Sequence, residues 1–114
     1  MFTGIIKNFS EVTDIQRNGS NLDLWLRSEI TSDLSIDQSV AHNGICLTVV
    51  AIQEDQYKVT AISETIQRTN IGDWKLGENI NIELAMVANH RFDGHMVQGH
   101  IDQTATCQSI IDQN

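Results

Sequence analysis

Short apolar stretches, several with alternating apolar and polar positions, are separated by turn-forming residues along most of this chain. Leu22, Leu24 and Leu26 alternate with polar or bulky residues, which is typical of a strand with one buried face. The pattern predicts strands over residues 5–15, 22–27, 45–52, 57–62, 80–84 and 100–110. Many short strands with turns between them favour a closed antiparallel barrel, because closure leaves no exposed sheet edge.

Turn residues and two short helical segments connect the predicted strands. Residues 18–21 and the pair Glu54-Asp55 indicate tight turns. Residues 41–44 are interpreted as a polar loop that leads into the strand at 45–52. One helical turn is expected at 31–34 and a second at 64–69, with Ser63 as the N-cap of the second and Gly72 past its end.

Length and charge exclude several classes of protein. A chain of 114 residues predicts one domain with a modest core. The net charge of −8 and the dispersed basic residues argue against a nucleic-acid partner, which needs clustered Lys and Arg. No apolar run approaches the ~20 residues of a membrane span, so no membrane partner is expected.

The two cysteines, Cys46 and Cys107, stand far apart and lack the dense spacing of a disulfide framework. The first residues do not have the basic region and apolar core of a signal peptide. A cytoplasmic location is therefore expected. The histidines, His42, His90, His95 and His100, do not have the spacing of a metal site, and none is predicted.

Cys46 and Thr48 are the first candidates for chemistry. Residues two apart in a strand share a face, so both side chains are expected to point into one pocket. A lone cysteine is also a common small residue of a core. A hydroxyl group pointing into a core needs a partner, however, and a polar-lined cavity would explain both side chains.

A weak internal repeat is also present. Met1, Gly4 and Ile6 recur as Met96, Gly99 and Ile101, and Val12 and Ile15 correspond to Cys107 and Ile110. Five loose matches do not by themselves distinguish a repeat from chance.

Four segments in this order, residues 1–6, 39–50, 64–72 and 94–102, resemble the N-terminal half of the riboflavin synthase family. The resemblance implies an all-β fold, a six-stranded antiparallel Greek-key β-barrel with one or two short helical turns. Family members contain two such barrels in tandem. Residues 1–95 would then be a lumazine-binding barrel, and residues 96–114 its closing strand or the start of a truncated second repeat.

The family activity implied is the dismutation of two 6,7-dimethyl-8-ribityllumazine molecules to riboflavin and 5-amino-6-ribitylaminouracil. No cofactor is implied, because the lumazine ring serves as its own electron sink. Both lumazine and riboflavin are implied ligands. The resemblance implies a homo-oligomer, a trimer for full-length members and a dimer for an isolated barrel. With half of the facing site missing, little or no turnover is expected of this chain alone.

The resemblance also implies site residues. Ser39 and Cys46 would lie near the reacting ring, and His100 would relay protons, since an imidazole titrates near neutrality. The implied ligand-binding residues are Gly4, Ile5, Ile6, Cys46, Leu47, Thr48, Thr60, Ala61, Ile62, Ser63, Glu64, Thr65, Gly99, His100 and Ile101. Within this set, the backbone of residues 60–65 would hydrogen-bond the pyrimidinedione edge of the ligand.

Two other classes of function stay open. One is a binding module similar to the lumazine proteins, which hold a lumazine without converting it. The other is an interaction or structural barrel with no small ligand, against which the polar pair Cys46 and Thr48 argues.

Overall fold

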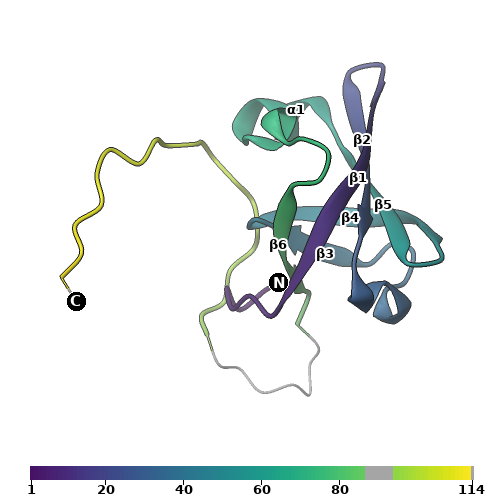
Figure 1. The fold of residues 1–114 in the computed structure, drawn as a ribbon, viewed down its shortest axis with the longest axis horizontal. Coiled ribbons are helices and arrows are strands. Elements are labelled where there is room, and N and C mark those ends of the chain that lie inside the picture. The colour runs from purple at the N-terminus through teal and green to yellow at the C-terminus, as the bar shows by residue number, and fades with distance from the viewer. Residues whose placement is uncertain (87–93, 114) are drawn as a thin grey trace.

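The computed structural model describes residues 1–86 and 94–113, and its main feature is a closed antiparallel barrel (Figure 1). The strands are β1 (Asn8–Asn18), β2 (Asn21–Arg27), β3 (Ser39–His42), β4 (Ile45–Gln53), β5 (Gln56–Ala61) and β6 (Asn79–Leu84). Around the barrel they follow the order β1-β2-β5-β4-β3-β6, and β6 closes onto β1. The β2–β3 connection crosses two strands, as in a Greek key. The six-stranded β-barrel fold is therefore confirmed.

In the described part of the chain, three short helical segments connect strands of the barrel. The 3-10 helices are η1 (Glu29–Asp33) and η2 (Ile71–Asp73), and the α-helix is α1 (Ser63–Arg68). Both expected helical turns are thus present, but Ser63 is not an N-cap. It lies inside α1, its side chain accepts a hydrogen bond from the Gln67 amide, and Ile62 occupies the cap position without a side-chain bond. No helix in the described part of the chain is long and apolar enough to cross a membrane.

The barrel interior is built by the alternation seen in the sequence. Leu22, Leu24 and Leu26 point inward from β2 and are at most 4% exposed. They join an apolar cluster with inward residues of the other strands. Full burial of each such side chain stabilises the fold by about 1.5–3 kcal/mol.

A polar chain of three side chains crosses this interior. The Ser10 and Tyr57 hydroxyl oxygens lie 2.7 Å apart, and the Tyr57 hydroxyl lies 2.8 Å from Nε2 of His42. Nδ1 of His42 is 3.0 Å from the Val40 carbonyl oxygen, which can only accept, so Nδ1 carries the proton. Nε2 then accepts from the Tyr57 hydroxyl, whose oxygen accepts from Ser10, so the polar side-chain atoms of these three residues are all hydrogen-bonded.

Strand β3 was not predicted, and the interpretation of residues 41–44 as a loop is wrong in its first half. Ala41 and His42 are the last residues of β3, and only Asn43 and Gly44 form the turn to β4. Both turn residues have positive φ, at 50° and 85°, which is the geometry of a two-residue hairpin. The Asn-Gly pair was the signal for this hairpin.

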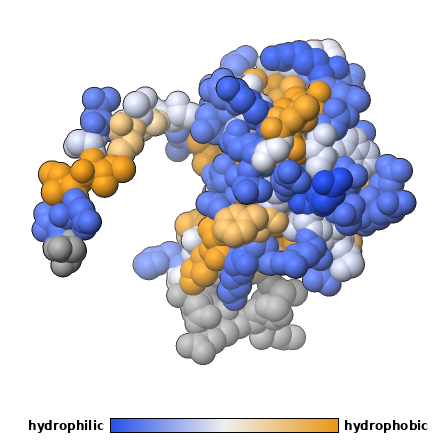
Figure 2. All heavy atoms as spheres, in the orientation of Figure 1, coloured by the Kyte–Doolittle hydropathy of each residue, from blue (hydrophilic) through white to orange (hydrophobic). Residues whose placement is uncertain are grey.

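The predicted strand at 100–110 is also wrong. Residues 98–113 have no helix or strand, and β6 completes the barrel without them. Beyond residue 101 the described tail is exposed and stands away from the barrel (Figures 1 and 2). Its apolar residues Ile110 and Ile111 are 88% and 77% exposed.

A second layer lies on the outside of the barrel, where residues 94–101, here called the strap, run beside the N-terminal residues. Phe2 and Val97 exchange two backbone hydrogen bonds of 2.7 and 2.8 Å, and the His95 amide donates to the Thr3 carbonyl. Phe2 is 1% exposed, although it does not belong to the interior cluster. Residues 2–3, before the first strand, and residues 95–97, after the last strand, are therefore held together outside the sheet.

Candidate functional site

The candidate site, here called the α1 pocket, lies where β4 and β5 separate. These strands pair from Gln53↔Gln56 only as far as Val49↔Val59, with a bulge at the end of the ladder. Beyond Val59, β5 leads into α1, whereas β4 runs back to Ile45 beside β3. The resulting pocket of about 400 Å³ is large enough for a small molecule. Its lining comprises Ile45, Cys46, Ile62, Glu64, Thr65, Arg68, Thr69, Gly99, His100, Ile101 and Asp102.

Helix α1 forms one wall. Ile62 is one of its lining residues and is 53% exposed. Glu64 and Arg68, one turn apart, form an ion pair of 3.2 Å at the rim. This wall can offer an apolar contact together with both charge signs.

The strap forms the opposite wall. Because β5 does not pair with the first residues of β4, the Cys46 amide lacks a strand partner on that side, and it donates to the Gly99 carbonyl at 3.0 Å. A Cβ atom on Gly99 would lie 2.9 Å from the Cys46 Cβ, and Gly99 has φ +78°. Glycine therefore permits this close approach, which places His100 and Ile101 over the pocket.

Cys46 and Thr48 share a face of β4, as the sequence predicted, but this face is the outside of the barrel. Ile45, Leu47 and Val49 point inward and are buried, whereas Cys46 is half-buried and Thr48 is exposed. Cys46 lines the α1 pocket and Thr48 does not. Ser39 is the cross-strand partner of Thr48 and also lies outside the lining.

The structure brings together about half of the expected ligand-binding residues. Those that line the pocket are Cys46, Ile62, Glu64, Thr65, Gly99, His100 and Ile101. Those that do not line it are Gly4, Ile5, Ile6, Leu47, Thr48, Thr60, Ala61 and Ser63. Of this second group, Leu47 and Ala61 are buried in the barrel interior, and the Thr60 hydroxyl donates to Asp23 on β2. Ile5 lines a different cavity.

Four lining residues were not anticipated: Ile45, Arg68, Thr69 and Asp102. Arg68 and Thr69 lie within the second predicted helical turn, and Asp102 directly follows the expected segment 99–101. The helical spacing could have indicated Arg68 as a lining residue, because it lies one turn after Glu64 on the same face of the helix. No comparable local signal marked Ile45, whose side chain is buried.

His42 and Tyr57, whose pKa values are shifted by burial, lie in the barrel interior, outside the pocket lining. Burial lowers the pKa of His42 to about 4, and the hydrogen bond to the Val40 carbonyl offsets part of this shift. Burial also raises the pKa of Tyr57 above its ordinary value, against the effect of the Ser10 hydroxyl. His42 is therefore neutral at pH 7 and forms part of the core.

His95 and His100 are both exposed. His90, named above among the histidines, lies outside the described residues. Within residues 1–86 and 94–113, no group of three His, Cys, Asp or Glu side chains could hold a metal ion.

Comparisons with known proteins agree with this architecture. Riboflavin synthase of Bacillus amyloliquefaciens is 41% identical over 111 residues, which are 96% of this chain and 52% of that protein. Riboflavin synthase of Bacillus subtilis strain 168 is 38% identical over all of this chain and 54% of its own length. The chain thus spans about half the length of the curated relatives it matches.

A crystal structure of LumP complexed with 6,7-dimethyl-8-(1'-D-ribityl) lumazine superposes with a TM-score of 0.87 at 22% identity, covering all of this chain and 64% of LumP. It shows that the two proteins share a fold. The family model described as the lumazine binding domain matches residues 3–85, which include all six strands of the barrel. This chain belongs to the lumazine-binding domain family.

Proposed function

We propose that this chain binds 6,7-dimethyl-8-ribityllumazine and riboflavin in the α1 pocket, as the N-terminal substrate-binding barrel of a riboflavin synthase. The observation that carries the proposal is the composition of the pocket. Cys46, the α1 residues and the strap come from three segments far apart in the sequence, and they line one cavity of about 400 Å³. Two riboflavin synthases that match nearly the whole chain support the parent activity.

The reaction needs two lumazines. One donates a four-carbon unit to the other, which becomes riboflavin, and the donor leaves as 5-amino-6-ribitylaminouracil. The ring provides the electron sink and no cofactor enters the proposal. The tasks of the protein are to hold two rings face to face, to bind their edges and to move protons.

Each pocket residue has a role in this proposal. His100, exposed at the edge of the pocket, relays protons, and Cys46 lies beside the bound ring. The backbone amides of residues 63–65 are available for the ring edge, because they lie in the first turn of α1, where amides have no partner within the helix. Ser39 retains a role only if the ligand extends past Cys46 along the outer face of β3 and β4.

A single barrel binds one of the two lumazine rings that must be held face to face. We infer a homo-oligomer, a dimer for this chain and a trimer for full-length members, with a cytoplasmic location. In such a dimer two pockets come near each other without the residues that a second barrel would supply. Turnover by this chain alone is then far below that of a two-barrel enzyme, because the effective molarity depends on alignment to about an ångström.

The test is a fluorescence titration with riboflavin followed by a turnover assay with the lumazine. Saturable quenching at micromolar riboflavin, one ligand per barrel, supports the binding proposal. Absence of any signal at ~100 µM, about −5.5 kcal/mol, contradicts it. Turnover at ~1 s⁻¹ by the chain alone would show that the second barrel is not needed for the reaction.

A second candidate function is a non-catalytic lumazine- or flavin-binding protein. The fold shared with LumP favours it, since crystal structures show LumP in complex with a lumazine, with riboflavin and with flavin mononucleotide. Reconstitution with a separately produced second barrel distinguishes the two functions: a synthase half gains turnover, and a pure binding protein does not.

A further inference from the structure

Glu83 on β6 lies in the same row of the sheet as Cys46. It pairs with Ala41 on β3, and Ala41 pairs with Cys46 on β4. Neighbouring strands are about 4.8 Å apart, so Glu83 is about 10 Å from Cys46 across the sheet. The neighbours of Ala41 on β3, Val40 and His42, point into the interior, so the row lies on the outer face. Ala41 is nonetheless only 4% exposed, which shows that the outer face is covered at this row.

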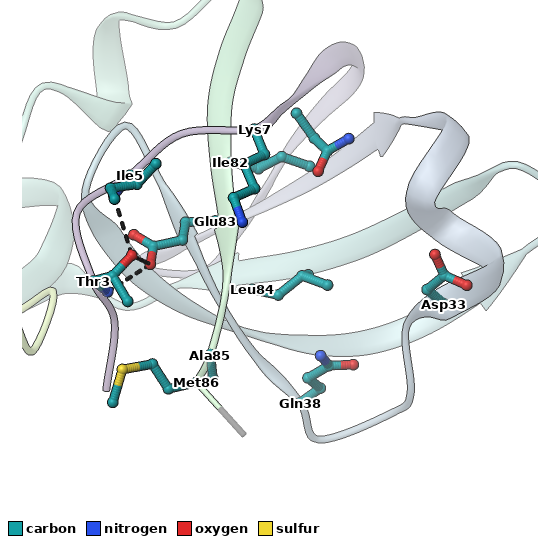
Figure 3. Close-up of a pocket in the computed structure, with 11 residues that line it drawn as sticks. Thr3, Ile5, Lys7, Asp33, Gln38, Ile82, Glu83, Leu84, Ala85 and Met86 are labelled. Carbon is teal, nitrogen blue, oxygen red and sulfur yellow. Dashed lines mark hydrogen bonds between the residues drawn. The ribbon is translucent and has the colours of Figure 1, made fainter. Parts of the chain in front are cut away.

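The Glu83 carboxylate holds the N-terminal residues by three hydrogen bonds. Its Oε2 accepts from the Thr3 amide at 2.6 Å and from the Thr3 hydroxyl at 2.8 Å, and its Oε1 accepts from the Gly4 amide at 2.9 Å. Figure 3 shows the carboxylate turned toward Thr3. All three partners are donors, so a carboxylate, which only accepts, fits them. A glutamine would direct its own N–H groups at one of these donors.

The N-terminal residues held in this way carry the strap. Phe2 exchanges two backbone hydrogen bonds with Val97, and Thr3 accepts from the His95 amide. Two residues after Val97, the Gly99 carbonyl accepts from Cys46 and closes the pocket wall. One connected path therefore leads from Glu83 through residues 2–4 and 95–99 to the α1 pocket.

Glu83 itself does not line the α1 pocket. It lines another cavity, of about 440 Å³, with Thr3, Ile5, Lys7 and residues 82–86 (Figure 3). Glu83 therefore acts on a ligand in the α1 pocket without touching it, and the hydrogen-bonded path through the strap connects the two sites.

We propose that Glu83 is a positioning residue for the α1 pocket: it anchors residues 2–4, and these hold the strap that forms one wall of the pocket. The proposal rests on the proposed function for the identity of the ligand. Its structural part, the coupling of Glu83 to the strap, does not need a ligand.

The experiment compares Glu83→Gln with the parent chain by amide exchange and by riboflavin titration. In Glu83→Gln, the amides of Phe2, His95, Val97 and Cys46 exchange at least about tenfold faster, the effect of losing a charge-assisted hydrogen bond. Amides of the β2–β5 ladder keep their protection, and the riboflavin Kd rises about tenfold. Glu54→Gln, at the tip of the β4–β5 hairpin, makes the same change of charge and alters neither measurement.

A second pair of variants retains the carboxylate. Thr3→Val removes the hydroxyl, which donates to Glu83 and accepts from the Ile5 amide, and it produces a smaller change of the same kind. Thr3→Ser keeps the hydroxyl and restores the parent behaviour. This pair also decides the matter if Glu83→Gln fails to fold.

Unchanged exchange at the amides of Phe2, His95, Val97 and Cys46, or faster exchange with an unchanged Kd, overturns the proposal. A uniform loss of protection across the β2–β5 ladder also overturns it, because Glu83 would then act on the whole barrel. If the parent chain does not bind riboflavin, the proposed function fails, and the exchange measurement still decides whether Glu83 holds the strap.

Discussion

Tyr57 and His42 share a hydrogen bond of 2.8 Å inside the barrel, where both side chains are fully buried. Tyr57 lies on β5 and His42 on β3, and β4 runs between these strands. The bond therefore spans the barrel interior and links two strands that do not pair. Ser10 on β1 extends the link across the barrel.

We expect Tyr57→Phe to destabilise the fold without preventing it. The substitution removes the donor to His42 Nε2 and the acceptor of the Ser10 hydroxyl, and it leaves both groups buried. The free energy of unfolding in urea at pH 7 should fall by about 1–3 kcal/mol. In the double variant with Ser10→Ala the loss should be less than additive, and strict additivity would mean that the two residues act independently.

Stability should fall as the pH is lowered from about 6.5 to about 4, because burial holds the pKa of His42 at about 4. An unfolded histidine has a pKa of about 6.5, so below that pH the unfolded chain binds the extra proton and the folded chain does not. Above pH 7 the titration of His42 does not change the free energy of unfolding. Near pH 4 it lowers the free energy of unfolding by about 3 kcal/mol.

Urea unfolding across this pH range checks the prediction. In a His42→Gln variant the free energy of unfolding should depend less on pH between 4 and 6.5, since glutamine has no titrating ring. A proton NMR titration that shows His42 protonating near pH 6.5 in the folded state would contradict it.

Gly99→Ala should reduce riboflavin affinity by about tenfold to a hundredfold. The added Cβ meets Cys46 at 2.9 Å, and the positive φ of 78° adds strain, so the strap must shift. Gly19→Ala is the matched control: its φ is also positive, at 63°, but nothing lies within 4 Å of the new Cβ. Equal affinities for the two variants would show that the contact with Cys46 is unimportant.

Cys46→Leu and Thr48→Val should differ in their effect on ligand binding. The leucine adds volume to a pocket wall under the strap and should raise the riboflavin Kd by about tenfold. Thr48 is exposed and outside the lining, so its valine variant should bind within about twofold of the parent. A large loss in Thr48→Val would mean that the ligand extends along the outer face of β4 toward Ser39.

The local sequence pattern predicted much of the barrel, because apolar and polar residues alternate along its longer strands. The leucines of β2 and the apolar run of β4 gave correct strands, and residues 18–21 gave a correct turn. Strand β3 has only four residues, and three of them are buried in succession, so it has no alternation to detect. A histidine among those residues resembled loop composition, although it is one of the most buried side chains of the fold.

The candidate site was less predictable because its parts depend on tertiary contacts. The face shared by Cys46 and Thr48 follows from the strand period, but the side of the barrel on which it lies does not. The strap has an irregular backbone that is held by Phe2 and Cys46, and the predicted strand at 100–110 overlapped only its last two residues. The link through Glu83 joins residues 80 positions apart, and no local pattern indicates it.

The contact between Cys46 and Gly99 also sets an order of events during synthesis. Chains emerge from the ribosome N-terminal end first, and β6, the last strand of the barrel, ends at Leu84. The barrel ladders can thus complete before the strap has emerged, whereas the pocket wall cannot. Ligand binding should therefore appear later than compaction of the barrel, and a nascent chain that has exposed only its first 95 residues should be folded and still unable to hold riboflavin tightly.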